Sequence, residues 1–308
     1  MSSTILKFKE YIKNTAYMAK KEGAGYLFVA PFMLLFCLFT VVPVIISMFY
    51  SFTYYNILEP AKFIGWENYT KLILADDVFL IALKNTLTFA VITAPAGYLA
   101  SFVLAWLLCE LGSKTRTVLV FLFYIPSISG NMFMIWSYLF SGDAYGLING
   151  FLLKLGLINV PVLWLQNPKY IMTIIIAASL WMSLGTTFLT FVAGLQAFDR
   201  TLFEAGAMDG IKNRFQELWY ITLPTMRPQL TFAAVISIAG AFSVSDIAVS
   251  LAGMPSVDYS AHMIMTHLQD YGSIRFEMGY ACAIAVVLFV IMITANKLIS
   301  LFIGRIGK

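Results

Sequence analysis

The residues of this chain whose side chains could carry out chemistry are few and widely spaced. Its two histidines, His262 and His267, are five positions apart, which is off the i, i+4 spacing that places two metal ligands on one helical face. The three cysteines, Cys37, Cys109 and Cys282, are too few and too scattered for a disulfide framework or a metal cluster. The sequence therefore predicts no metal site.

Nucleotide-binding and nucleophilic patterns are also missing from the sequence. The fragment nearest to a phosphate-binding loop, Gly112-Ser113-Lys114-Thr115, lacks the Gly-Lys pair that such a loop needs. Because both histidines fall in one loop, no Ser/His/Asp or Cys/His arrangement is indicated. We therefore expect no catalytic residue and no cofactor in this chain, which is typical of a membrane conduit whose energy comes from a gradient or a partner.

Small hydroxylated residues occur within two of the apolar stretches. One stretch carries Ser183, Thr186 and Thr187, and the next carries Ser243 and, if it extends to Leu251, also Asp246. Such side chains let membrane helices approach closely, which is their structural interpretation. The functional interpretation is a polar path for a hydroxyl-rich solute, and these five residues are our candidates for its lining.

Asp246 is the only acidic residue well inside any apolar stretch. An aspartate at the centre of a membrane helix costs about 2.5–3.5 kcal/mol on insertion scales. We therefore expect it to face the bundle interior or a water-filled cavity, on the same helical face as Ser243. A hydrogen-bond partner on a neighbouring helix, with Arg275 nearby, is the structural alternative.

Membrane helices must position these candidates. Of the 308 residues, 60% are hydrophobic and 12% are charged, and the mean hydropathy is +0.82. A soluble domain carries roughly 25% charged residues, so a soluble enzyme and a disordered chain are both excluded. A membrane helix needs about 20 mostly apolar residues. Six stretches without Asp, Glu, Lys or Arg predict six spans: 23–58, 85–109, 117–142, 170–198, 228–245 and 278–296.

The distribution of lysine and arginine predicts the orientation. Fourteen lie in the N-terminal tail, the loops after the second and fourth spans and the C-terminal end, and six lie in the other loops. By the positive-inside rule both termini are cytoplasmic. Residues 1–25 form a basic tail, and 26–308 form the membrane domain. Lys154 and several helix breakers interrupt the apolar segment 144–168, so we expect a structured loop with an interfacial helix, although a seventh span stays open.

The loop 197–227 has a composition that favours docking to another protein. Asp199 can cap a helix over 200–209, and Gly210 can end it. Three small residues, 205–207, make a thin surface that fits a partner's groove. A second helix, about 212–220, is expected to bury its apolar side chains and to stop before Pro224. The apolar side chains in question are Phe215, Leu218 and Trp219.

This loop resembles a known motif. Glu204-Ala205-Gly206, Asp209-Gly210 and Ile221-Thr222-Leu223-Pro224 are similar to the EAA loop, EAA-x3-G-x9-I-x-LP, of permeases of binding-protein-dependent ABC importers. Gly206 replaces the alanine at the third position of the motif, and ten residues rather than nine separate Gly210 from Ile221. The resemblance implies that Glu204, Ala205, Gly206, Asp209 and Gly210 dock on an ATPase subunit.

Other segments resemble the carbohydrate branch of that family, in the same order along nearly the whole chain. Phe63 to Tyr69 resembles its F-x-G-x-x-N-Y loop, and Phe242 to Asp246 its F-x-x-F-D pattern with Ser245 in place of Phe. The remaining matches are Asn85-Thr86, Pro126, Trp136, Gly146, Asn149, Gly253-Met254-Pro255 and Met278-Gly279-Tyr280-Ala281.

The resemblance implies an all-α, six-span permease with the type I ABC importer fold in a bacterial or archaeal cell membrane. The implied partners are a second homologous permease, two copies of an ABC ATPase that hold ATP and Mg²⁺, an extracytoplasmic solute-binding protein and a sugar substrate. No nucleic acid is implied. ATP would drive alternating access through the coupling loop.

Three other functions stay open at this stage. An ABC permease for another solute, such as an amino acid or peptide, would share the coupling loop. An ion-driven carrier usually shows inverted repeats and several intramembrane ionisable groups, of which this chain has one. A membrane enzyme is the least favoured, because no catalytic constellation is present.

Overall fold

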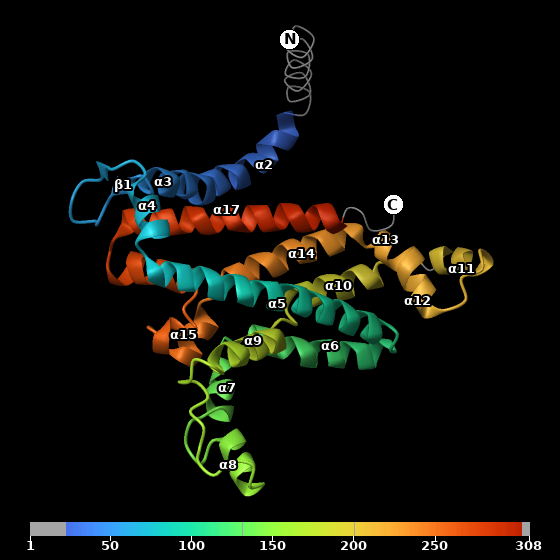
Figure 1. Ribbon diagram of the computed structural model, residues 1–308. Helices are drawn as coiled ribbons and strands as arrows, with labels where there is room; N and C mark the ends of the chain where they lie inside the picture. The colour runs from blue at the N-terminus through green and yellow to red at the C-terminus, as the bar shows by residue number, and fades with distance from the viewer. Residues whose placement is uncertain (1–22, 131, 200, 304–308) are drawn as a thin grey trace.

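The computed structural model describes residues 23–130, 132–199 and 201–303. Most of these residues form helices that lie side by side in a bundle (Figure 1). One end of the bundle carries α4 (Glu67–Leu74) and the strands β1 (Thr53–Tyr54) and β2 (Lys62–Phe63); we call it the α4 end. The opposite, α11 end carries α11 (Thr201–Met208) and α12 (Arg214–Glu217). Most of the predicted basic tail, residues 1–22, lies outside the described residues.

Within the described ranges, five helical segments are long and apolar enough to cross a membrane. They are Gly25–Tyr50, Asp77–Cys109, Ile171–Gln196, Arg227–Ala252 and Met278–Ile303. A sixth arises if α6 (Ser113–Ile128) and α7 (Phe133–Leu139), which meet at 81°, count as one broken span. Each predicted stretch thus contains helix, but the count is five or six, and the third stretch is bent rather than straight.

Two of these segments are interrupted near their middles. The fourth predicted span consists of α9 (Ile171–Met182) and α10 (Thr186–Gln196), and the fifth of α14 (Arg227–Phe242) and α15 (Asp246–Ala252). The second and last spans are the unbroken helices α5 (Asp77–Cys109) and α17 (Met278–Ile303). The backbone therefore loses its helical hydrogen bonds at two points inside the bundle.

Proline explains two wider, π-helical turns. The first span runs from α2 (Gly23–Phe36) through the π turn η1 (Cys37–Val41) into α3 (Val42–Tyr50). Pro43 cannot donate to the carbonyl of residue 39, so the helix opens there. The same happens at η2 (Leu218–Thr222), which ends two residues before Pro224, and the chain continues into α13 (Leu223–Thr225). The expectation that the helix stops before Pro224 is therefore wrong.

The segment 144–168 does not form a seventh span. Its helix α8 (Leu147–Lys154) has eight residues, which reach only about 12 Å. Asn149 is fully buried and organises the loop around it, because its side-chain amide donates to the carbonyls of Ser141, Asp143 and Val162. Its Oδ1 accepts from Val162 N and Trp164 Nε1. The structured loop is confirmed.

Three short elements complete the α4 end. They are the 3-10 turn η3 (Val257–Tyr259), α16 (Ile264–Gln269) and the π turn η4 (Asp270–Ile274). β1 and β2 pair antiparallel, with Thr53 opposite Phe63, so the all-α description needs this one small correction. Residues 55–61 connect the two strands of this hairpin, which precedes α4.

The apolar core is divided into two clusters. One lies toward the α4 end and includes Phe89 of α5, Ile175 of α9 and Ile284 of α17. The other lies toward the α11 end and is centred on Phe188 and Phe191 of α10. Apolar packing is therefore interrupted between them, at the level where α9 gives way to α10.

Candidate functional site

A cavity of about 270 Å³ lies between the two core clusters. Helix α5 forms one wall, the junction of α9 and α10 a second, and α14 a third. Polar lining comes from hydroxyl groups alone among the described residues: Thr93, Ser179, Ser183, Thr186, Thr187 and Ser237. The rest of the lining is apolar or glycine: Phe89, Ala94, Gly97, Met182, Gly185, Ile236, Gly240, Ala241 and Val244. The lining is therefore largely apolar, with hydroxyl groups and no charged side chain among the described residues.

The break between α9 and α10 opens this cavity. Helix α9 ends at Met182, and α10 starts at Thr186 after Gly185, which has φ −107° and ψ −127°. Gly185 provides no side-chain cap, so the first N–H groups of α10 have no intrahelical acceptor. Irregular backbone at membrane depth is stable only where protein or a water-filled cavity surrounds it. The break therefore supplies the cavity with backbone donors.

Side-chain hydroxyls at the cavity present mostly acceptors. Thr93 donates to Phe89 O at 2.8 Å, Ser183 to Leu180 O at 2.7 Å and Ser237 to Ala94 O at 3.1 Å. A hydroxyl whose proton is committed to a carbonyl still offers its oxygen lone pairs. Ser179 Oγ is buried without a partner in the described part of the chain. A solute rich in hydroxyl groups can donate to such oxygens.

Two glycines keep the walls of the cavity close together. A Cβ added at Gly97 of α5 would meet the Cβ and Oγ of Ser183 at 3.0 Å, and one at Gly185 would meet the Cβ of Ser127 at 3.1 Å. By contrast, a Cβ at Gly240 of α14 would meet nothing within 4 Å. Gly97 and Gly185 thus allow close helix approach, whereas Gly240 leaves space open in the cavity.

The structure separates the five predicted path residues into two groups. Ser183, Thr186 and Thr187 line the cavity, whereas Ser243 and Asp246 do not. The helix ends at Phe242 and restarts at Asp246, so the two do not share one helical face.

Asp246 is exposed on the surface of this chain, where its Oδ1 accepts from Ser245 Oγ at 3.1 Å. Arg275 pairs with Asp270 at 2.7 Å rather than with Asp246. The expectation of an inward-facing carboxylate is therefore wrong within this chain. A role of Ser243 and Asp246 in the path stays a prediction that needs surface from another subunit.

Sequence reasoning left three lining hydroxyls out of the site. Thr93 lies four residues before Gly97, and Ser179 four before Ser183, so each pair stacks on one helical face. Ser237 contributes from α14 and bonds to α5. The i, i+4 pairs of small or hydroxylated residues are a signal that could have found the first two.

The loop 197–227 begins as predicted. The Oδ1 of Asp199 accepts from Thr201 N at 3.0 Å, and this hydrogen bond keeps the pKa of Asp199 below its ordinary value. At the other end, Ile211 N donates to Gly206 O and Gly210 N to Ala207 O, which together form a Schellman motif. Gly210 has φ +91°, a region that side chains resist. The predicted cap and the predicted end of the helix are confirmed.

The residues predicted to dock on an ATPase lie on different faces of α11. Glu204, Ala205, Asp209 and Gly210 are exposed. Gly206 is buried, and a Cβ there would meet the Cδ1 of Ile221 at 2.6 Å. Gly206 therefore packs α11 against η2, while the neighbouring residues Ala205 and Ala207 remain exposed in this chain.

The second half of the loop differs from the expectation. Phe215 and Trp219 are 74% and 65% exposed, and Leu218 is half-buried. The prediction that this helix buries all three is wrong: η2 contacts α11 through Ile221, and the Phe215 ring lies beside the Trp106 ring of α5, with ring centroids 5.9 Å apart. Arg214 lies 3.6 Å from Glu110 at the end of α5 and 3.2 Å from Glu217.

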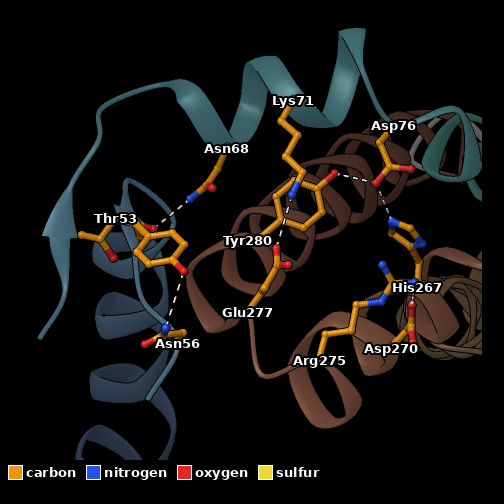
Figure 2. Close-up of polar contacts among 11 residues, drawn as sticks. Thr53, Asn56, Asn68, Lys71, Asp76, His267, Asp270, Arg275, Glu277 and Tyr280 are labelled. Carbon is orange, nitrogen blue, oxygen red and sulfur yellow. Dashed lines mark hydrogen bonds and ion pairs between the residues drawn. The ribbon is translucent and has the colours of Figure 1, made fainter. Parts of the chain in front are cut away.

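Several residues that carried the resemblance fix the backbone of the α4 end. Asn68 Nδ2 donates to the carbonyls of Ser51 and Thr53, both at 2.9 Å (Figure 2). Asn85 Nδ2 donates to two carbonyls of the segment before α16, both at 3.0 Å. Gly279 N donates to Tyr55 O, and a Cβ there would collide with Thr53 O. These motif positions have structural roles.

Comparison with known proteins agrees with these features. Residues 96–308 match the family described as "Binding-protein-dependent transport system inner membrane component". The chain is 32% identical over 290 residues to the probable ABC transporter permease protein YesP of Bacillus subtilis, covering 91% of this chain and 90% of that protein. It is also 32% identical over 284 residues to the arabinooligosaccharides transport system permease protein AraP of Bacillus subtilis, covering 91% and 88%.

A solved structure shares the fold. It is a bacterial ABC transporter involved in the import of the acidic polysaccharide alginate, and the matched chain is 25% identical with a TM-score of 0.70. The match covers 96% of this chain and 100% of that one. The resemblance predicted from the sequence is therefore confirmed, and the chain belongs to the family of inner membrane components of binding-protein-dependent transport systems.

Proposed function

We propose that this chain is a permease subunit of an ATP-driven importer for a sugar or oligosaccharide. The observation that carries the proposal is the uncharged, hydroxyl-lined cavity at the helix break between α9 and α10. Broken helices with free backbone groups are typical of transporter substrate sites. The names of the relatives, a permease for arabinooligosaccharides and a transporter for alginate, support a carbohydrate substrate.

The same cavity argues against an ion-driven carrier. Ionisable side chains that bind the coupling ion usually lie in the path of such carriers. In the described part of the chain, the lining of this cavity includes none. An amino acid or peptide, which carries charges, would also lack a charged counterpart there. A neutral, hydroxyl-rich solute fits the lining best.

The assembly that we propose follows the family. A second homologous permease completes the path, two ABC ATPase subunits supply ATP and Mg²⁺, and an extracytoplasmic binding protein delivers the solute. This chain then crosses a bacterial or archaeal cell membrane six times, with α6 and α7 as one broken span and both termini in the cytoplasm. The α11 end faces the ATPase, and the α4 end faces the binding protein.

The contacts of α11 suggest how its movement reaches the cavity. Gly206 seats α11 on Ile221 of η2, and η2 runs through α13 into α14 with one residue between them. Helix α14 then lines the cavity at Ile236, Ser237 and Gly240. When the ATPase subunits close and shift α11, α14 shifts against α5, where Ser237 bonds to Ala94 O. This movement would alternate the access to the cavity.

A substitution that fills the cavity tests the proposal. Gly240→Val adds side-chain volume where an added Cβ meets nothing within 4 Å, so the fold tolerates it. Ala100→Val on an exposed position of α5 is the matched control. In proteoliposomes with the binding protein, we expect Gly240→Val to lose most sugar uptake while assembly and basal ATP hydrolysis persist. Normal uptake across a panel of oligosaccharides with Gly240→Val would remove the cavity from the path.

A further inference from the structure

A buried chain of hydrogen bonds lies at the α4 end, and none of its residues lines the cavity. Asp76 caps α5 by accepting from Phe79 N at 2.9 Å through Oδ1. Its Oδ2 accepts from Tyr280 OH at 2.7 Å and lies 3.1 Å from His267 Nε2 (Figure 2). His267 Nδ1 in turn lies 3.1 Å from His262 Nε2. Asp76, His262 and His267 form what we call the two-histidine site.

Hydrogen-bond direction fixes the tautomers of both rings. The Asp76 carboxylate can only accept, so His267 Nε2 carries a proton and His267 Nδ1 accepts. His262 Nε2 therefore donates, which leaves His262 Nδ1 as an unprotonated acceptor. That atom is buried without a partner among the described residues, in a side chain that is 3% exposed. The chain of hydrogen bonds thus ends on a nitrogen that is free to take a proton.

The segment 254–277, which carries both histidines, is held on α5 at the same place. Asn85 of α5 donates to the carbonyls of Tyr259 and His262, and Ile264 N donates to Thr86 Oγ1 at 2.9 Å. The contact between His267 and Asp76 links α16 to the start of α5 through two side chains. Loss of the hydrogen-bond chain would therefore weaken the attachment of this segment.

Other charged and titratable groups around the site come from every element that packs there. Lys71 of α4 lies 4.4 Å from the centre of the Tyr280 ring and pairs with Glu277 at 3.3 Å (Figure 2). Arg275 pairs with Asp270 at 2.7 Å and lies over the Tyr271 ring. Tyr271 contacts His267, and Tyr259 contacts His262. The two nearby ion pairs are internally balanced, so they add no net charge to the site.

We propose that the two-histidine site is a proton-binding site, and that protonation at His262 Nδ1 releases the segment 254–277 from α5. A proton added there makes His262 Nδ1 a buried donor without an acceptor. His262 Nε2 then accepts from His267 Nδ1, and the positive charge rests on His267 beside Asp76. One proton enters from water onto His262 Nδ1, and one hydrogen-bonded proton moves from His262 Nε2 to His267 Nδ1, so only N–H bonds are made and broken. The closed arrangement disfavours this state, and an open segment hydrates it.

The direction of the pKa shifts agrees with this geometry. Burial, reinforced by the neighbouring His267, lowers the pKa of His262 to about 4, and burial also lowers the pKa of His267. Burial works to raise the pKa of Asp76, but hydrogen bonds from Tyr280 and Phe79 and the nearby His267 hold it below its ordinary value, so the carboxylate stays charged. A histidine with a lowered pKa stabilises the closed form above its ordinary pKa of about 6.5 and loses that contribution as the pH falls.

The test measures the opening of the segment in the assembled transporter in nanodiscs. In a background without native cysteines, Ala261→Cys reports opening because Ala261 is 2% exposed, and Val257→Cys is the exposed reference on the same segment. The ratio of their maleimide labelling rates cancels the intrinsic pH dependence of the thiol. Between pH 7.5 and pH 5 we expect this ratio to rise at least tenfold and up to roughly thirty-fold, because the labelling rate of a buried site follows the open population.

Three variants distinguish the proposal from general acid loosening. Ala178→Cys, buried in α9, should stay unlabelled at pH 5. His262→Gln keeps a donor for His267 but removes the titrating nitrogen, so most of the rise should vanish. Tyr280→Phe, which removes one donor to Asp76, should raise the labelling of Ala261→Cys at pH 7.5. A rise below twofold, an equal rise in His262→Gln, or labelling of Ala178→Cys that rises in parallel would each overturn the proposal.

Discussion

The two ends of the bundle are held together by different kinds of contact. At the α4 end, buried side chains bond to backbone carbonyls, as Asn68 and Asn85 do, and Gly279 lets the last helix touch the β1 strand. At the α11 end, α11 rests on Ile221 through Gly206, and exposed ion pairs of Arg214 add to this. A buried hydrogen bond to a carbonyl tolerates little displacement, whereas an apolar contact can slide. The α11 end is thus the end suited to move as a unit.

The largest loss of stability is expected for a substitution at the α4 end. Gly279→Ala places a Cβ on the carbonyl oxygen of Thr53, which is backbone and cannot give way. We expect the assembled protein to lose more than about 3 kcal/mol of stability, or to fail to assemble. Thermal unfolding in detergent would measure it. Gly272→Ala is the control, because its Cβ meets Ala281 at an ordinary 3.4 Å, and equal behaviour of the two variants would contradict the argument.

At the α11 end, substitutions at two adjacent residues should distinguish the packing of α11 on η2 from the binding of the ATPase. Gly206→Val pushes against the flexible tip of Ile221, so we expect a loss of about 1–3 kcal/mol and weaker co-purification of the ATPase. Ala205→Val adds the same side chain to an exposed face, so stability should stay within about 0.5 kcal/mol while ATPase binding falls. If Ala205→Val leaves ATPase binding normal, the exposed face of α11 is not the docking surface.

The end of α11 should respond to backbone strain. Gly210→Leu forces a side chain onto a residue with φ +91°, which costs about 1–2 kcal/mol for one left-handed residue. We expect transport to fall and the ATPase to co-purify poorly, while the permease stays in the membrane. Gly112→Leu, at φ −57° with free space around its Cβ, is the control. Normal transport and normal ATPase binding by Gly210→Leu would contradict the coupling role.

The smallest expected effect concerns the ion pairs of the loop. Arg214→Ala removes contacts to Glu110 and Glu217, but the Arg214 side chain is 63% exposed, so water screens both pairs. We expect a stability change of less than about 1 kcal/mol, which higher salt reduces further. Lys212→Ala, also exposed, provides the control. A loss above about 2 kcal/mol would mean that the loop is tied to α5 as firmly as the α4 end is to its neighbours.

Local signals explain the predictions that the structure confirms. The apolar stretches, the Asp199 cap and the Gly210 end depend on residues within one or two helical turns, so they can be read without knowing the neighbours. The family likewise follows from short motifs in order. The prediction that the helix stops before Pro224 was wrong because a proline usually ends a helix. Here the preceding residues form the π turn η2, and the helix continues into α13.

The sequence alone determined that the chain is a helical membrane protein of a permease family, because hydropathy, cap residues and motif spacing are local properties. Only the tertiary structure decided what faces what. It turned Phe215, Trp219 and Asp246 outward, brought Thr93 and Ser237 beside Ser183, and joined His262 and His267 to Asp76, some 190 residues earlier. For Trp219 and Asp246 the physical reason is that a π turn or a helix break rotates the side chains within and after it. Which face becomes interior therefore depends on packing between distant segments, and the one-dimensional pattern does not encode that packing by itself.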